Sequence, residues 1–142
     1  MRSHPLRLLT LVLACALATA SVPSSAQPIA AESQPTLRIE APASLPIGAS
    51  RIAVVVHLPQ GPTMPLLLTV NVEGEALQVV RARFLRSDAR LDATGELRFE
   101  VPVLVRAPGI ALLRADLSTY RCRQTCQQVR AQTALQLSVG SS

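Results

Sequence analysis

Residues 120–126, Tyr-Arg-Cys-Arg-Gln-Thr-Cys, lie between two runs in which apolar and polar residues alternate. If residues 123–125 form a three-residue hairpin loop, Cys122 lies opposite Cys126, and every cross-strand pair has the same sum of residue numbers. One face then collects the pairs Ala111–Leu137, Leu113–Leu135, Leu117–Ala131 and Thr119–Val129. The other face collects polar side chains, although the choice of loop does not require this separation. The stretch therefore predicts a β-hairpin with both cysteines on its polar face.

Five further runs upstream predict strands, because apolar residues recur at every second position and turn-forming residues separate the runs. These runs cover residues 36–40, 51–58, 66–72, 77–85 and 97–105. Pro102 cannot donate a ladder hydrogen bond and suggests an edge strand or a bulge. About seven strands over residues 36–139 predict an all-β, immunoglobulin-like antiparallel β-sandwich. The Cys-Trp-Cys spacing of antibody domains is absent, so the prediction concerns architecture alone.

The first 26 residues have the three-part plan of a secretory signal peptide. Arg2 and Arg7 precede an apolar run, and small residues precede Gln27. Cleavage is expected after Ser24-Ser25-Ala26, with Ala18-Thr19-Ala20 as the second candidate. The apolar run is too short for a membrane anchor. Residues 27–35 form a polar, proline-bearing lead-in that we expect to be flexible. The sequence thus predicts a periplasmic or secreted protein with no membrane span in the mature chain.

Cys15 raises a second possibility for the leader. Residues 12–15, Val-Leu-Ala-Cys, resemble the end of a bacterial lipoprotein signal, in which a cysteine becomes lipidated. The bulky Leu13 departs from that pattern. We therefore favour Cys15 as one more apolar residue of the signal core and keep a lipid anchor as the alternative.

Composition and charge argue against several classes of function. Aromatic residues make up 2% of the chain and Trp is absent, which leaves little for stacking on sugars or bases. The formal charge is +5, and without Arg2 and Arg7 of the leader 12 Arg face 9 acidic residues, a net charge of +3. So small and scattered a charge does not predict nucleic-acid binding. A deep pocket would be needed to support carbohydrate or small-ligand binding.

No catalytic, cofactor-binding or metal-binding pattern is present in the sequence. The phosphate-binding, zinc-binding and nucleophile motifs of known enzyme classes are missing. His57 lies in a predicted strand without a second histidine, so we interpret it as a rim residue. Two carboxylate pairs, Asp88 with Asp92 and Glu73 with Glu75, occupy predicted turns, where acidic residues serve local hydrogen bonding. We expect no cofactor and no metal.

The pair Cys122 and Cys126 supports two interpretations. Disulfides persist in exported proteins. As a structural bond, the pair closes a short loop, and chain entropy assigns it about 2 kcal/mol. As a functional bond, it is exposed at a hairpin end beside Arg121 and Arg123, which would stabilise a thiolate, and it could exchange with another thiol protein.

The end of the chain also resembles a known family. An alternating strand ending in Tyr-x-Cys, then a short loop, a second Cys and a polar final strand, is similar to the end of the periplasmic N-terminal domain of the thiol:disulfide interchange protein DsbD. The resemblance covers about the last thirty residues. It implies an immunoglobulin-like fold, a redox couple formed by Cys122 and Cys126, and Tyr120 as a neighbour of that couple.

Two functional hypotheses follow. The first is a small exported, non-catalytic, immunoglobulin-like accessory or interaction module, whose C-terminal hairpin is closed by a disulfide between Cys122 and Cys126. Its expected partner is another exported or membrane-bound protein. The alternative is a periplasmic thiol:disulfide exchange domain that uses the same two cysteines.

Overall fold

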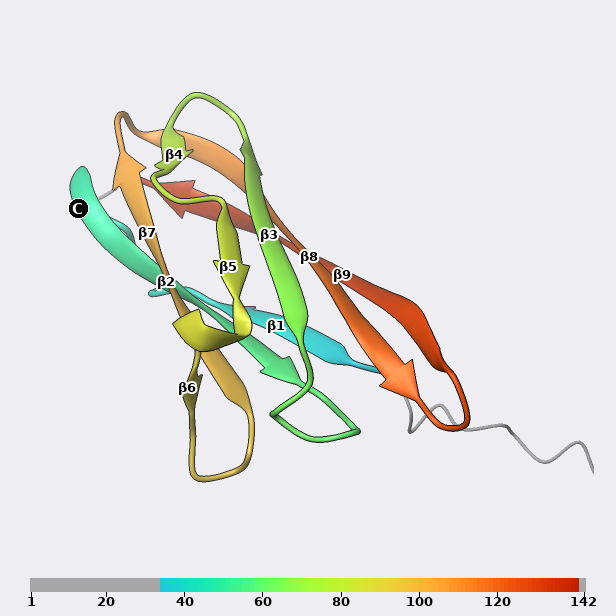
Figure 1. Cartoon of the computed structure of the whole chain (residues 1–142). Coiled ribbons are helices and arrows are strands. Elements are labelled where there is room, and N and C mark those ends of the chain that lie inside the picture. The colour runs from blue at the N-terminus through green and yellow to red at the C-terminus, as the bar shows by residue number, and fades with distance from the viewer. Residues whose placement is uncertain (1–33, 141–142) are drawn as a thin grey trace, which may run out of the picture.

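The computed structural model describes residues 34–140, which form two facing antiparallel sheets (Figure 1). The predicted signal peptide, Cys15 and the lead-in up to Ser33 lie outside the described residues. Sheet A contains, in spatial order, β1 (Thr36–Glu40), β2 (Gly48–His57), β7 (Leu97–Val105) and β4 (Leu77–Val79), and β6 (Arg90–Leu91) also pairs with β7. Sheet B contains β5 (Arg83–Leu85), β3 (Leu66–Glu73), β8 (Gly109–Cys122) and β9 (Cys126–Val139). The predicted all-β, immunoglobulin-like sandwich is confirmed. Among residues 34–140, no helix is long and apolar enough to cross a membrane.

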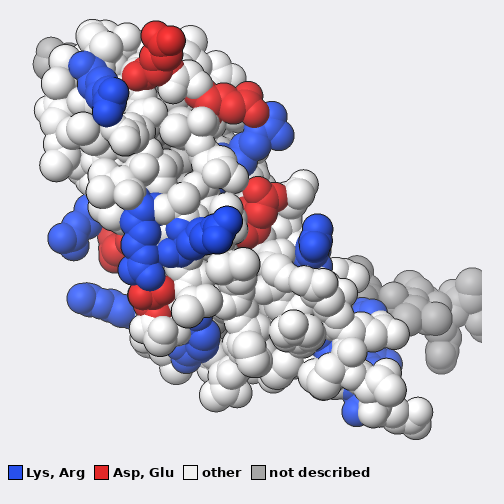
Figure 2. Space-filling view, turned by 45° about the horizontal axis from the view of Figure 1, so that its top comes forward, with Lys and Arg blue, Asp and Glu red and all other residues white. Residues whose placement is uncertain are grey.

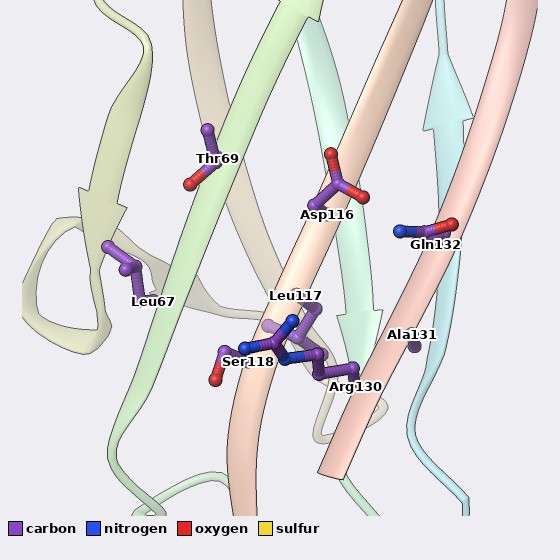
Figure 3. Close-up of a pocket in the computed structure, with 8 residues that line it drawn as sticks. All are labelled: Leu67, Thr69, Asp116, Leu117, Ser118, Arg130, Ala131 and Gln132. Carbon is purple, nitrogen blue, oxygen red and sulfur yellow. The ribbon is translucent and has the colours of Figure 1, made fainter. Parts of the chain in front are cut away.

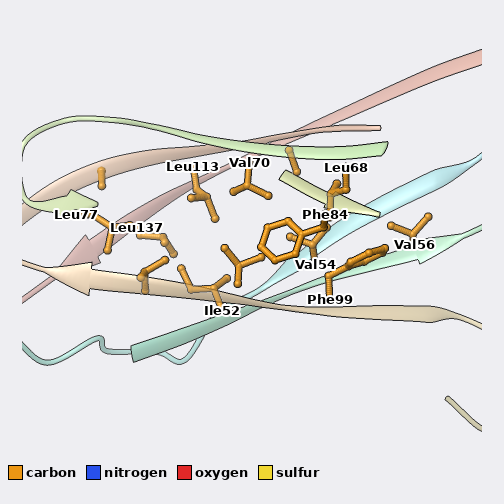
Figure 4. Packing of buried hydrophobic residues seen from close by; sticks show 14 of the residues in the cluster. Ile52, Val54, Val56, Leu68, Val70, Leu77, Phe84, Phe99, Leu113 and Leu137 are labelled. Carbon is orange, nitrogen blue, oxygen red and sulfur yellow. The ribbon is translucent and has the colours of Figure 1, made fainter. Parts of the chain in front are cut away.

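The core lies between the two sheets and consists almost entirely of aliphatic side chains (Figure 4). Alternate residues of each strand point inward, as the period of two requires. Sheet A contributes Ile52, Val54 and Phe99, and sheet B contributes Leu68 and Leu113, all of them buried. The two aromatic rings of the core, Phe84 and Phe99, meet edge to face with their centroids 6.1 Å apart. The low aromatic content of the chain, 2%, accounts for this kind of core.

The hairpin of β8 and β9 has the predicted register. Cys122 pairs with Cys126, and the pairing continues without interruption to Gly109 opposite Val139. Leu113 and Leu117 of β8 are buried on the inner face, as predicted. A hairpin loop and one apolar face were sufficient to fix this register.

The predicted strand over residues 77–85 is instead two strands in different sheets. β4 pairs with β7 in sheet A, whereas β5 pairs with β3 in sheet B. The crossing at residues 80–82 is held by Arg81, which donates to Asp88 at 2.7 Å and to the carbonyl of Arg83 at 2.9 Å. Within residues 34–140, the split strand and the two-residue β6 raise the predicted seven strands to nine.

The edge position suggested for Pro102 is wrong for the strand that contains it. β7 lies inside sheet A, with β2 on one side and β4 and β6 on the other, and its register with β2 has no bulge. The carbonyl of Pro102 accepts a hydrogen bond from the N–H of Val80 at 3.0 Å. The ring nitrogen of Pro102 therefore faces the β4 side, just where β4 ends at Val79. Pro102 therefore lacks an N–H only at the position where β4 ends, and β7 loses no hydrogen bond within the β4–β7 ladder.

The outer face of sheet A carries a network of ion pairs. Arg38 of β1 binds Glu96 through both terminal nitrogens at 2.8 Å, and Arg98 of β7 binds Glu40 at 2.6 Å. Between β1 and β7, Val55 of β2 pairs with both arginines and is only 1% exposed, although it points away from the core. The long aliphatic stems of arginine side chains commonly lie along apolar surface, so the two flanking arginines account for the burial of Val55.

Candidate functional site

The candidate site is the end of the β8–β9 hairpin, residues 120–128, which we call the hairpin tip. Cys122 and Cys126 form a disulfide, and their Cα atoms are 4.0 Å apart. The pairing of β3 with β8 begins at Leu66 opposite Thr119, so the hairpin tip extends past the end of β3. Figure 1 shows the tip as the orange and red turn at one end of the molecule.

The disulfide joins a pair of residues that do not hydrogen-bond to each other across the hairpin. The N–H of Arg123 donates to the carbonyl of Thr125 at 3.2 Å, and bonded and non-bonded pairs alternate along an antiparallel ladder. Cys122 and Cys126 therefore form a non-bonded pair. Side chains approach most closely at such pairs, which is the geometry that a cross-strand disulfide needs.

Gln60 clamps the outer edge of the hairpin tip. Its side-chain carbonyl accepts from the N–H of Cys122 at 2.8 Å, and its amide donates to the carbonyl of Cys122 at 3.3 Å. These two bonds reproduce what a neighbouring strand would supply at a position that β3 does not reach. The segment between β2 and β3 thus holds the backbone of one cysteine in place.

Apolar residues support the base of the tip from the inner side. Pro35, Leu58, Met64 and Val129 line a cavity of about 10 Å³, roughly the smallest volume that holds one water molecule. Thr119 is 2% exposed, and its hydroxyl donates to the carbonyl of Pro65 at 2.7 Å. The lower part of the hairpin is therefore packed and hydrogen-bonded, while residues 123–128 are exposed.

The three residues predicted to neighbour the cysteines, Tyr120, Arg121 and Arg123, take different positions. Tyr120 lies two residues before Cys122 on the same face of the strand and is 46% exposed. Arg121 is half-buried and lines the small cavity with Leu58, because successive strand residues point to opposite faces. Of the two arginines expected beside the cysteines, only Arg123 lies in the exposed loop.

The hairpin tip is also basic. From Leu117 to Gly140 the chain contains Arg121, Arg123 and Arg130 and no acidic residue. In Figure 2 acidic and basic side chains lie side by side over most of the visible face, whereas only basic ones are visible next to the grey trace. A partner that binds this end would meet positive charge.

The two cysteines of the disulfide differ in solvent exposure. Cys126 is exposed, whereas Cys122 is half-buried and has its backbone held by Gln60. Disulfide exchange requires an incoming thiolate to reach one sulfur in line with the bond. The arrangement can therefore act chemically as a fixed staple, or as a bond that is open to attack from the side of Cys126.

The other residues discussed in the sequence analysis lie at a strand end, in local turn hydrogen bonds or in an ion pair. His57 is exposed at the end of β2. Asp88 accepts from the N–H of Leu85 and from Arg81, which lowers its pKa, the backbone bond having the larger effect. The pKa of Asp92 is also lowered, first by the hydroxyl of Thr94 and then by backbone N–H groups within the same turn. Glu73 pairs with Arg114 at 3.0 Å. Within residues 34–140, no group of His, Cys, Asp and Glu could hold a metal ion.

A second surface feature, which the sequence did not indicate, is a hollow on the outer face of sheet B (Figure 3). Two cross-strand rows line it, Leu67–Ser118–Arg130 and Thr69–Asp116–Gln132, and its volume is about 250 Å³. None of the described residues that line it is aromatic. A hollow of this kind follows from the cross-strand order β3–β8–β9, which a single sequence does not reveal.

Comparisons with known proteins bear on the fold alone. The chain matches no model of a protein family and no curated protein sequence. Among solved structures, it is similar to the crystal structure of native alpha-2-macroglobulin from Escherichia coli that spans domain MG7 to the C-terminus, with a TM-score of 0.51 and 16% identity. The match covers 75% of this chain and 16% of that one. The cryo-EM reconstruction of the native conformation of E. coli alpha-2-macroglobulin matches with a TM-score of 0.43 and 15% identity, over 70% of this chain and 6% of that one. The chain thus has the fold of one segment of a much longer protein.

Proposed function

We propose that this chain is a small exported, non-catalytic, immunoglobulin-like accessory or interaction module, and that the disulfide between Cys122 and Cys126 is a structural staple of its hairpin tip. The partner is another exported or membrane-bound protein. The observation that carries the proposal is the clamp of Gln60 on Cys122, because it fixes the backbone of the tip independently of the disulfide. A rigid, exposed hairpin end is suited to binding and is poorly suited to the opening and closing of a redox couple.

Three further features support export and interaction. Disulfides are typical of exported domains. The first 26 residues have the plan of a signal peptide. The tip carries an exposed Tyr120 and a basic Arg123, and amphipathic aromatic and arginine side chains are common at protein interfaces. The lipid-anchor alternative at Cys15 remains part of this proposal, because an anchored module would act at the same membrane surface.

The reduction potential of the disulfide tests the proposal. The folded chain is equilibrated in a series of glutathione redox buffers, and the fractions of oxidised and reduced Cys122 and Cys126 are measured by alkylation and mass spectrometry. A staple should resist reduction, with a potential below about −300 mV. A potential in the range of the thiol oxidoreductases, above about −270 mV, would overturn the structural role.

The same titration tests the second candidate, a thiol:disulfide exchange domain of the kind that the hairpin resembles. The exposure of Cys126 is the observation that favours it. The exchange hypothesis expects a potential near that of the oxidoreductases and a mixed disulfide with a small thiol through Cys126. A potential below about −300 mV excludes it.

A further inference from the structure

β9 is the one long sheet edge that residues 34–140 leave without a neighbouring strand. β9 has 14 residues, pairs with β8 on one side and pairs with no strand on the other. The remaining edge strands are short: β1 has five residues, β4 and β5 three each and β6 two. A long free edge is the usual template for pairing with another chain.

The even-numbered residues of β9 direct their backbone groups to this free edge. Cys122 and Cys126 form a non-bonded pair, so the ladder between β8 and β9 uses the odd-numbered residues of both strands. The opposite edge of the sheet agrees, because the N–H of Val70 in β3 points away from β8 and donates to Ala82 at 2.8 Å. The outward-facing residues over the central part of the edge are Gln128, Arg130, Gln132, Ala134 and Gln136.

The sequence of β9 itself contains none of the usual protective devices. Sheet edges are commonly blunted by Pro, Lys or a bulge. β9 contains neither Pro nor Lys, its register with β8 is unbroken, and Arg130 is its only charged residue. Within residues 34–140, Leu45 bridges Val139 at the C-terminal end and accepts the N–H of Gly140 at 2.7 Å, and β1 of the facing sheet lies close to β9 without hydrogen-bonding to it.

We propose that β9 pairs antiparallel with β9 of a second copy of this chain, about a two-fold axis at Gln132. Gln132 then pairs with its own counterpart, Arg130 with Ala134, and Gln128 with Gln136, with two hydrogen bonds for each such pair. The two four-stranded sheets would join into one continuous sheet. This interface is independent of the hairpin function proposed above.

Side-chain complementarity supports a second copy as the occupant. On the outer face, the register at Gln132 places each Arg130 opposite the small Ala134, so no like charges face each other. On the inner face it places the half-buried Val129 opposite Leu135, and Ala131 opposite Thr133, so each copy covers apolar surface of the other.

Two other registers with an even-numbered residue on the axis are worse. A shift to a two-fold axis at Arg130 sets two positive charges directly opposite each other, which destabilises a cross-strand pair. A shift to an axis at Ala134 shortens the overlap and brings Val139, which Leu45 bridges, into it. Of these three registers, the one centred on Gln132 combines the longest pairing with compatible side chains.

Substitutions at Gln132 test the proposal, with sedimentation equilibrium of the exported chain as the measurement. The unaltered chain should show twice the monomer mass within roughly 1 μM to 1 mM. Gln132→Pro removes an outward N–H that β8 does not use, so the sandwich should keep its strands in circular dichroism while dimerisation weakens about tenfold or more. The control is Gln124→Glu in the exposed hairpin loop, which should leave the dimer unchanged. A proline at position 124 is avoided as the control because it would disturb the disulfide.

Charges introduced at Gln132 distinguish this register from other modes of dimerisation. Gln132→Glu and Gln132→Lys each place like charges at the two-fold axis, and each variant alone should dimerise more weakly than the unaltered chain. Mixing the two variants should restore the dimer, because Glu then faces Lys. Dimers that ignore these substitutions would overturn the proposal.

A monomer at every concentration would also overturn the proposal, and hydrogen exchange would then identify the alternative. Protected amides at the even-numbered residues from Gln128 to Gln136 in the monomer would show that the chain covers its own edge, because only these N–H groups face away from β8. Unprotected amides would show that the edge is left for a strand of a different protein.

Discussion

Gln60 is the residue on which the geometry of the hairpin tip depends most. β3 ends before it reaches Cys122, and the side chain of Gln60 supplies the missing donor and acceptor. An amide side chain can do both because it carries a carbonyl and an N–H₂ group. The sequence shows Gln60 only as part of the turn Pro59-Gln60-Gly61-Pro62, because its partner is 62 residues away.

Replacing this side chain should loosen the tip without unfolding the sandwich. Gln60→Ala leaves the N–H and carbonyl of Cys122 to water, and we expect a loss of about 1 kcal/mol for the two hydrogen bonds at this exposed site. The measurement is urea unfolding, together with amide exchange at Cys122, which should become faster. Gln124→Ala, in the adjacent loop, is the control. Equal effects of the two substitutions would contradict the clamp.

At the scale of elements, local patterns predicted the strands, and long-range pairing decided how they are used. The β8–β9 register could be predicted because loop length and one apolar face are both local properties. The division of residues 77–85 between two sheets could not, because β4 pairs with β7 and β5 pairs with β3, and neither partner is the adjacent strand in the chain. Pro102 was interpreted as the signal of an edge strand or a bulge, whereas it lies opposite the point where β4 ends.

The candidate site was predictable to a similar extent. The sequence identified Cys122, Cys126 and Tyr120 and their common face, because these follow from the hairpin. It placed Arg121 beside the cysteines, whereas strand alternation turns that residue to the inner face. The position of Val55 between Arg38 and Arg98 depends on the order of β1, β2 and β7, so no local sequence pattern indicates it.

The ion pairs that link β1 and β7 should make the sandwich sensitive to acid. The pKa of Glu40 is lowered, mainly by Arg98 and next by Arg38, and the pKa of Glu96 is lowered by Arg38. A carboxylate whose folded pKa lies below its ordinary value of 4.5 stabilises the fold above that pH. The contribution is lost as the pH falls from 4.5 through the lowered pKa.

Glu96→Gln tests this contribution. At pH 7 the variant should unfold at lower urea concentration than the unaltered chain, and the difference should shrink as the pH falls below 4.5 and as salt is added. Urea midpoints measured from pH 7 downward provide the comparison. Glu75→Gln, in the exposed turn between β3 and β4, is the control. A difference that persists unchanged in acid would contradict the assignment.

At the scale of the whole molecule, stability comes from the contact between the sheets and much less from the disulfide. The disulfide closes a loop with a sequence separation of 4 at a tip that extends past β3. So small a loop removes little entropy from the unfolded chain. The buried face instead joins every major strand, and within it Phe99 is fully buried and packs edge to face on Phe84.

Two variants separate these contributions. Replacing both Cys122 and Cys126 with Ser should cost about 2 kcal/mol and leave a folded sandwich, because the Gln60 clamp and the β8–β9 ladder remain. Phe99→Ala opens a cavity between the sheets and should cost about 3–5 kcal/mol. Urea unfolding of the oxidised chain and both variants gives the order directly. If loss of the disulfide proved the more costly, the hairpin tip would be the anchor of the fold, and its bond could not be opened in an exchange reaction without unfolding the protein.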